Sequence, residues 1–68
     1  MKYLYNEGDS CHYECLRELK GNNTIKFWLK LGGTWKLMGV TADNFSDDVK
    51  YIEISKSEAE GLLFIDNI

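Results

Sequence analysis

Residues 25–38, IKFWLKLGGTWKLM, are the stretch that decides the expected fold. Two runs rich in β-branched and aromatic residues flank Gly32-Gly33, a pattern that predicts a β-hairpin. The stretch also contains both tryptophans of the chain, Trp28 and Trp35. Side chains alternate between the two faces of a strand, so the pairing of these two strands determines which tryptophan is buried.

Two registers fit this hairpin. A two-residue loop pairs Leu31 with Thr34, whereas a three-residue loop with Gly33 in the left-handed region pairs Lys30 with Thr34. A shift of one residue moves every side chain to the other face, and the second register separates apolar from polar side chains better. We therefore expect the three-residue loop. Its apolar face carries Phe27, Leu29, Trp35 and Leu37.

Length and composition restrict the class of protein. Sixty-eight residues, 44% of them hydrophobic and 13% aromatic, predict one small folded domain over residues 1–68. No stretch reaches the ~18 apolar residues of a membrane span, and the N-terminal MKYLYNEGDS lacks the apolar segment of a signal peptide. We therefore expect a cytoplasmic protein whose cysteines stay reduced.

Charge is distributed unevenly along the chain. Residues 1–40 carry six lysines and arginines against four acids (net +2), and residues 41–68 carry two against seven (net −5). The hairpin region is therefore basic and the C-terminal third is acidic. This asymmetry is more informative about partners than the overall charge of −3.

Further elements flank the hairpin. Residues 3–5 and 49–54 are predicted strands, and residues 6–9 a turn. Residues 11–20 fit a strand or an amphipathic helix. We favour the strand, because residues 21–24 are a good hairpin connection and a strand there pairs an otherwise open sheet edge.

The C-terminal helix has the clearest local signal. Ser55-Lys56-Ser57-Glu58 is a capping box, in which the Ser55 hydroxyl and the Glu58 carboxylate each accept a hydrogen bond from the other residue's amide. The predicted helix continues to about Ile65, and Gly61 inside it costs about 1 kcal/mol relative to alanine. Its buried side consists of Ala59, Leu62 and Leu63.

These elements predict an α+β fold. We expect a small twisted antiparallel β-sheet of three to five strands, with the one C-terminal helix packed on its apolar face. The predicted core consists of Phe27, Leu29, Trp35, Leu37, Ile52, Ile54, Leu62 and Leu63.

Three weak metal-ligand candidates, Cys11, His12 and Cys15, lie close together in the sequence. A structural zinc ion needs four ligands, and the chain has no other His or Cys. In a strand the two cysteines lie about 13 Å apart, too far for a disulfide. We expect structural thiols and neither a metal nor a cofactor. Because His12 has no obvious catalytic partner, we also expect no enzymatic activity and no small-molecule substrate.

The most suggestive surface is a tryptophan among lysines. In the expected register Trp28 lies on the polar face, opposite Lys36. Such a patch can stack a nucleic-acid base, cover a tryptophan with lysine methylenes, or contact a protein. The overall acidity disfavours nucleic acid. The predicted interaction patch consists of Lys26, Trp28, Lys30, Lys36, Met38 and Tyr51.

The leading hypothesis is a small protein-interaction module that associates with itself as a homodimer, because nine aromatics (two Trp, four Tyr, three Phe) are many to bury in 68 residues. One alternative is an acidic inhibitor, of the kind that phages or mobile elements encode, that mimics nucleic acid and binds a host or defence enzyme. A second is weak single-strand nucleic-acid binding through Trp28. The acidic surface of the first alternative consists of Asp43, Asp47, Asp48, Glu53, Glu58 and Glu60.

Overall fold

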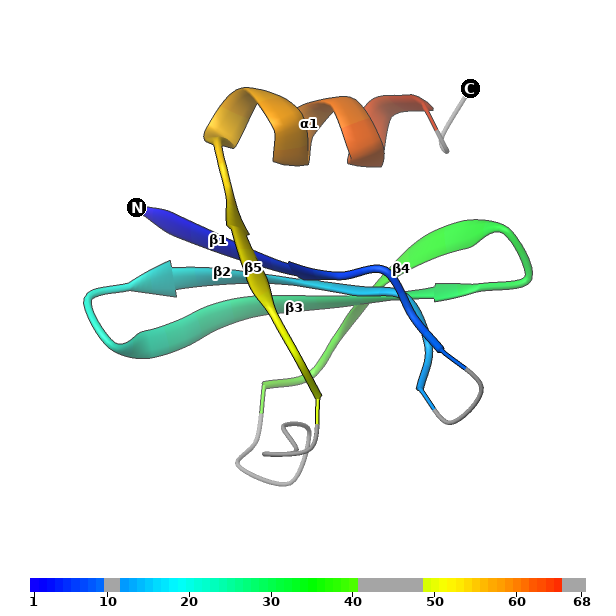
Figure 1. Ribbon diagram of the computed structural model, residues 1–68, viewed down its shortest axis with the longest axis horizontal. Helices are drawn as coiled ribbons and strands as arrows, with labels where there is room; N and C mark the ends of the chain where they lie inside the picture. Colours follow the sequence, from blue (N-terminus) through cyan, green and yellow to red (C-terminus); the bar gives the residue numbers. More distant parts are fainter. Residues whose placement is uncertain (10–11, 41–48, 66–68) are drawn as a thin grey trace.

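The protein has a two-layer α+β fold. The computed structural model describes residues 1–9, 12–40 and 49–65. Its elements are β1 (Lys2–Asn6), β2 (Cys15–Lys20), β3 (Asn23–Leu31), β4 (Thr34–Met38), β5 (Ile52–Ile54) and α1 (Lys56–Ile65). The strands form one five-stranded antiparallel sheet, and α1 lies across one of its faces (Figure 1). The predicted fold class is confirmed.

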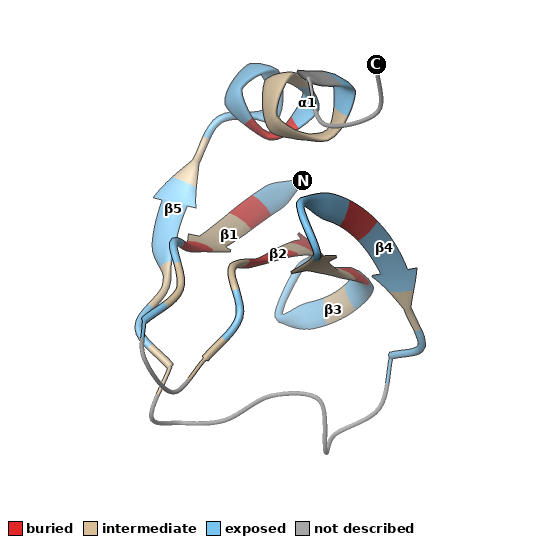
Figure 2. Ribbon diagram, turned by 90° about the vertical axis from the view of Figure 1, so that its right-hand side faces the viewer, coloured by how far each residue is buried: buried red, intermediate tan, exposed pale blue. Residues whose placement is uncertain are grey.

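The strand order of the sheet is β4-β3-β2-β1-β5. Strand β1 pairs with β2, β2 with β3 and β3 with β4, whereas β5 pairs with β1 at the opposite edge from β4. Helix α1 contacts β1 and lies above the sheet, with β5 to one side and β4 to the other (Figure 2). Strand β5 therefore extends the sheet beyond β1, the first strand of the chain, and α1 follows directly after it.

The central hairpin has the register that we did not expect. Leu31 pairs with Thr34 and Lys30 with Trp35, so the loop is the two-residue Gly32-Gly33. Both glycines have positive φ, 60° and 82°, as a type I′ hairpin turn requires. The predicted three-residue loop is wrong, and Trp28 lies opposite Leu37 instead of Lys36.

The register was mispredicted because both faces of the sheet carry buried side chains. Leu16 and Trp35 belong to the core under α1, and they are 0% and 6% exposed. Cys15 and Phe27 are each 4% exposed, and the alternation of side chains places them on the opposite face. A register chosen to give one apolar and one polar face is therefore wrong for this sheet, which buries side chains on both faces.

The core under α1 joins all parts of the fold. Complete burial of one large apolar side chain contributes about 1.5–3 kcal/mol, so this cluster is a main source of the chain's stability. Its buried members are Tyr3, Leu16, Trp35 and Ala59, and packed against them are Tyr5, Trp28, Ile54, Leu62 and Leu63.

The predicted core is correct in part. Trp35 is buried, and Ile54, Leu62 and Leu63 pack against the core as expected. Leu37 and Ile52 are 62% and 60% exposed, so their predicted burial is wrong. Phe27 is buried on the face away from α1, and Leu29 is half-buried. Both edge strands thus expose an apolar side chain beside the helix layer.

The other local predictions have mixed outcomes. Residues 15–20 form the favoured strand, although residues 12–14 are outside it. Strand β5 is shorter than the predicted 49–54. The expected loop over 41–48 is outside the described residues.

The capping box is confirmed. The Glu58 amide donates to Ser55 Oγ over 3.0 Å, and the Ser55 amide donates to Glu58 Oε1 over 3.3 Å. The amides of Ser55 and Glu58 at the helix start are therefore satisfied by side chains. Among residues 1–9, 12–40 and 49–65, no helix combines the length and the apolar character needed to cross a bilayer.

Candidate functional site

The predicted interaction patch does not form one surface. Side-chain alternation places Lys26, Trp28 and Lys30 on the helix face, and Lys36 and Met38 on the other face. Trp28 is half-buried against the core instead of exposed. The sixth member of the predicted patch also lies away from α1, because the Tyr51 hydroxyl is 3.9 Å from Cys15 Sγ.

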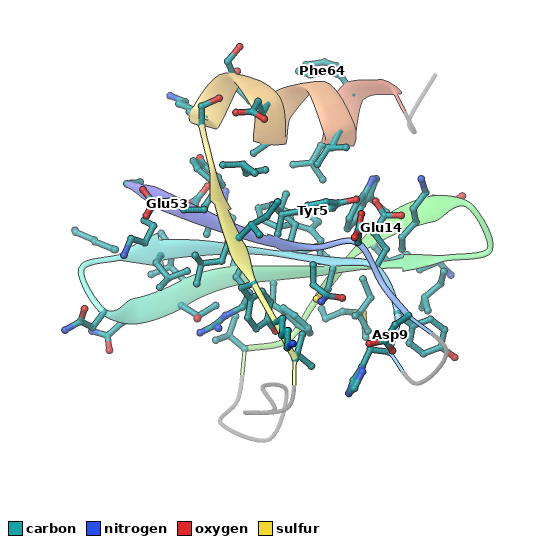
Figure 3. The ribbon with its side chains drawn as sticks, viewed as in Figure 1. Tyr5, Asp9, Glu14, Glu53 and Phe64 are labelled. Atoms are coloured by element: carbon teal, nitrogen blue, oxygen red, sulfur yellow. The ribbon has the colours of Figure 1, made fainter. Side chains whose placement is uncertain are left out.

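One lysine of that patch is held by an acidic partner. Lys30 Nζ lies 3.7 Å from Glu14 Oε1 and 5.9 Å from the centre of the Trp35 ring. The Tyr5 hydroxyl donates a 2.6 Å hydrogen bond to Glu14 Oε2, and Figure 3 shows these two side chains side by side beneath α1. Burial and then this hydrogen bond raise the pKa of Tyr5 well above its ordinary value of 10. This row of side chains fixes the Tyr5 ring in place.

A polar hollow of about 410 Å³ lies on one flank of α1. Inside it the Tyr3 hydroxyl donates a 2.8 Å hydrogen bond to Glu18 Oε1, and both residues are buried. The hydrogen bond to Glu18, together with burial, raises the pKa of Tyr3. The hollow is lined by Met1, Tyr3, Glu18, Lys26, Lys56 and Glu60. The lysines and glutamates of this hollow can neutralise one another's charge.

An apolar hollow of about 380 Å³ lies on the other flank, between α1 and β5, and we call it the apolar trough. Ile52 in it is 60% exposed, although its neighbour across the sheet, Tyr5, is half-buried. Gly61 leaves space here, since a Cβ atom added to it would meet nothing within 4 Å. The trough is lined by Tyr5, Ile52, Ile54, Glu58, Gly61 and Leu62.

A second hollow, of about 290 Å³, adjoins the trough. The two share Tyr5 and Ile52, and we call the added part the acidic end. Asn6 shapes it, because its Nδ2 donates to the Lys50 carbonyl over 2.7 Å and its Oδ1 accepts from the Gly8 amide over 2.8 Å. The residues that the acidic end adds are Asn6, Glu7, Gly8, Asp9 and Lys50. Together the two hollows form an elongated site, the α1–β5 surface.

The metal-ligand candidates do not assemble in the described structure. Cys15 is buried, and burial raises the pKa of its thiol, which favours the neutral form. His12 Nδ1 lies 3.1 Å from Asp9 Oδ1. Among residues 1–9, 12–40 and 49–65, no three His, Cys, Asp or Glu side chains are grouped as a metal site would need, and Cys11 is outside these ranges.

The predicted acidic surface is dispersed where it is described. Glu53, Glu58 and Glu60 are exposed. Glu53 lies 3.8 Å from Lys2 Nζ, Glu60 lies 4.0 Å from Lys56 Nζ, and Glu58 caps the helix. The remaining members, Asp43, Asp47 and Asp48, are outside the described residues.

Comparisons with protein-family models, curated proteins and solved structures find no match to this chain. The geometry of the site therefore carries the functional argument. The sequence did not identify Tyr5 as a site residue, and it did not predict that Gly61 and Ile52 line the same hollow. The available signal was Gly61 itself, since a glycine inside a predicted helix leaves that point of the helix surface without a side chain.

Proposed function

We propose that this protein binds another protein, carries out no reaction of its own, and makes the contact through the α1–β5 surface. The observation that carries the proposal is the apolar trough, where Ile52 is 60% exposed beside a half-buried apolar wall. Covering an exposed apolar side chain of this size contributes on the order of 1 kcal/mol. Apolar surface gathered in a hollow and rimmed by polar groups is typical of interaction sites.

The position of β5 also supports the proposal. In the described part of the chain β5 has one neighbour, β1, so its other side is an open sheet edge. An open edge presents backbone donors and acceptors to which another chain can add a strand. The trough lies directly beside this edge, so one partner can use backbone hydrogen bonds and apolar contacts together.

The absence of a reaction is supported by the state of three potentially reactive groups within residues 1–9 and 12–40. Cys15 is a buried thiol, and the Tyr3 and Tyr5 hydroxyls each donate to a carboxylate. Of these groups Tyr5 lines the apolar trough, and its hydroxyl is bonded to Glu14. The interaction hypothesis is therefore retained, with a different surface from the patch around Trp28.

The homodimer stays a prediction. Its expected interface combined Trp28, Met38 and Tyr51, which lie on two faces of the sheet. A second copy that used the α1–β5 surface symmetrically would bring the acidic groups of both copies together. Sedimentation equilibrium at micromolar concentration distinguishes a monomer of 7.9 kDa from a species of twice that mass.

Site-specific photocrosslinking in the native host tests the proposal. A photoreactive phenylalanine analogue at position 52 should form an adduct with one protein, identified by mass spectrometry. Position 37 is the matched control, because Leu37 is 62% exposed and Ile52 60%, and Leu37 lies on the far edge strand. Adducts from position 37 alone, or from neither position, would contradict the proposal.

A further inference from the structure

We infer that the α1–β5 surface binds an extended segment of a different protein, with an apolar side chain in the apolar trough and a lysine or arginine at the acidic end. The inference rests on the proposed function and specifies the chemistry of the partner. It follows from the shape and the charge of the α1–β5 surface and from the fixed position of the Tyr5 ring.

The shape of the surface favours an extended chain. Its two hollows, about 380 and 290 Å³, meet at Tyr5 and Ile52. Alternate side chains of a strand lie roughly 7 Å apart on one face, so successive side chains of one strand can enter both hollows. Ile52–Ile54 offers the edge along which such a strand can pair.

The charge of the surface selects a basic segment. Glu58 stands beside the apolar trough, and Glu7 and Asp9 line the acidic end with Lys50 as the cation there. Three acids against one base leave this surface negative, within a chain of net charge −3. Charge complementarity increases the association rate and selects among partners, and repulsion between like charges disfavours a second copy of this chain bound through the same surface.

The charge also gives the bound segment a direction. The carboxylates of Glu7 and Asp9 line the acidic end, on the far side of Tyr5 from the helix, whereas the other end of the surface is lined by Gly61 and Leu62 of α1 itself. A segment with its apolar residue under the helix places its cation near these two carboxylates. The reversed segment places its cation near Glu58, whose carboxylate already accepts a hydrogen bond from the Ser55 amide. A free apolar surface without this asymmetry would accept both directions.

The wall of the surface is already ordered. The Tyr5 hydroxyl is bonded to Glu14, which also lies near Lys30, so the tyrosine ring is held before any partner arrives. Preorganisation of this kind lowers the entropic cost of binding. The surface can therefore retain a short segment with few contacts.

Fluorescence anisotropy with synthetic peptides tests the inference. The probe is a ten-residue labelled peptide with the pattern Ile-x-Leu-x-Arg, compared with the same peptide carrying Glu in place of Arg. The Arg peptide should bind about tenfold more tightly at low salt, and the ratio should fall as salt rises. Equal affinity of the two peptides would overturn the inference.

Three variants locate the binding. Gly61→Leu fills the trough and should weaken the Arg peptide about tenfold. Ser57→Leu adds the same side chain at an exposed helix position outside the trough and should leave affinity unchanged. Glu7→Gln should lower the preference for Arg over Glu, with unchanged melting temperature as evidence that the fold is intact. Equal effects of the two leucine substitutions would overturn the inference.

The outcome separates this inference from the proposed function. If no peptide binds while position 52 crosslinks to a protein, the partner presents a folded surface, so the inference fails and the proposed function stands. If position 52 gives no adduct, the proposed function itself fails. Amide chemical shifts of Ile52 and Gly61 on addition of the Arg peptide report directly on the site.

Discussion

The two hollows beside α1 have similar volumes, about 380 and 410 Å³, and opposite chemistry. The apolar trough faces the edge strand β5 and contains the exposed Ile52. The polar hollow lies over the inner strands and contains the buried Tyr3–Glu18 hydrogen bond. A hollow of either kind has the room for a ligand, so volume alone does not identify a binding site.

The difference between them lies in what an occupant would gain. In the polar hollow a ligand must replace hydrogen bonds and ion pairs that the protein already makes, so the net gain is small. In the apolar trough a ligand removes apolar surface from water without breaking an internal contact. This contrast is the reason for assigning binding to the α1–β5 side and stability to the other side.

The largest expected effect follows from removal of Trp35, a buried member of the core that borders both hollows. Trp35→Ala should lower the free energy of unfolding by about 3–5 kcal/mol, because the side chain is 6% exposed and its removal leaves a cavity. Leu37→Ala on the same strand is the control and should cost less than about 0.5 kcal/mol at a largely exposed position. Urea denaturation measures both, and a larger loss for Trp28→Ala than for Trp35→Ala would contradict the burial described here.

A smaller loss should follow when the polar hollow loses its buried donor. Tyr3→Phe leaves the Glu18 carboxylate, 8% exposed, without its tyrosine and should cost about 1–3 kcal/mol. Tyr5→Phe is the matched substitution and should cost less, because Glu14 is less buried and keeps Lys30 nearby. Chemical denaturation of the two variants side by side compares the two hydrogen bonds, and the reverse order would contradict the assignment.

The trough itself should tolerate a small side chain. Gly61→Ala places a methyl group in open space within the helix and should stabilise the protein by up to about 1 kcal/mol. Gly33→Ala is the contrasting change, because φ is +82° there and the substitution should destabilise. Thermal melting of both variants tests the difference. A destabilising Gly61→Ala would mean that the trough is filled.

The smallest effect concerns alkaline pH. Burial, and then the nearby Cys15, raise the pKa of Tyr51 from 10.0 to about 12. The folded state therefore keeps this proton when the unfolded chain loses it, so stability is complete below pH 10 and falls as pH rises towards 12. Tyr51→Phe should make the decline of melting temperature with pH shallower, whereas Tyr13→Phe, at a 65% exposed position, should not. Equal slopes for both variants would contradict this account.

Local signals in the sequence predicted local structure well. The Ser55–Glu58 capping box located the start of α1, and Gly32-Gly33 located the turn of the hairpin. Each signal depends on neighbouring residues only, so the rest of the fold did not have to be known. The α+β class followed from these elements.

The predicted interaction patch around Trp28 is dispersed over two faces, because its prediction depended on the hairpin register. The predicted three-residue loop assumed that Lys30 lies on a polar face, away from the helix. Lys30 does face it, and it is accommodated by Glu14, sixteen positions earlier, and by the ring of Trp35. Sequence alone did not reveal that β5 would pair with β1. The trough exists only because of that pairing, so it was beyond local reasoning.

The pairing of β5 with β1 has a consequence for the order of folding. Strands β1 to β4 contact their neighbours in sequence, but Ile54 must find Tyr3 near the other end of the chain. Closing so long a loop costs entropy before its contacts form, so the β5–α1 unit is expected to join the sheet late and to detach first. A segment bound along β5 would stabilise that unit by mass action. Occupancy would then appear as slower hydrogen exchange of amides throughout α1, including those of helix residues that do not line the trough.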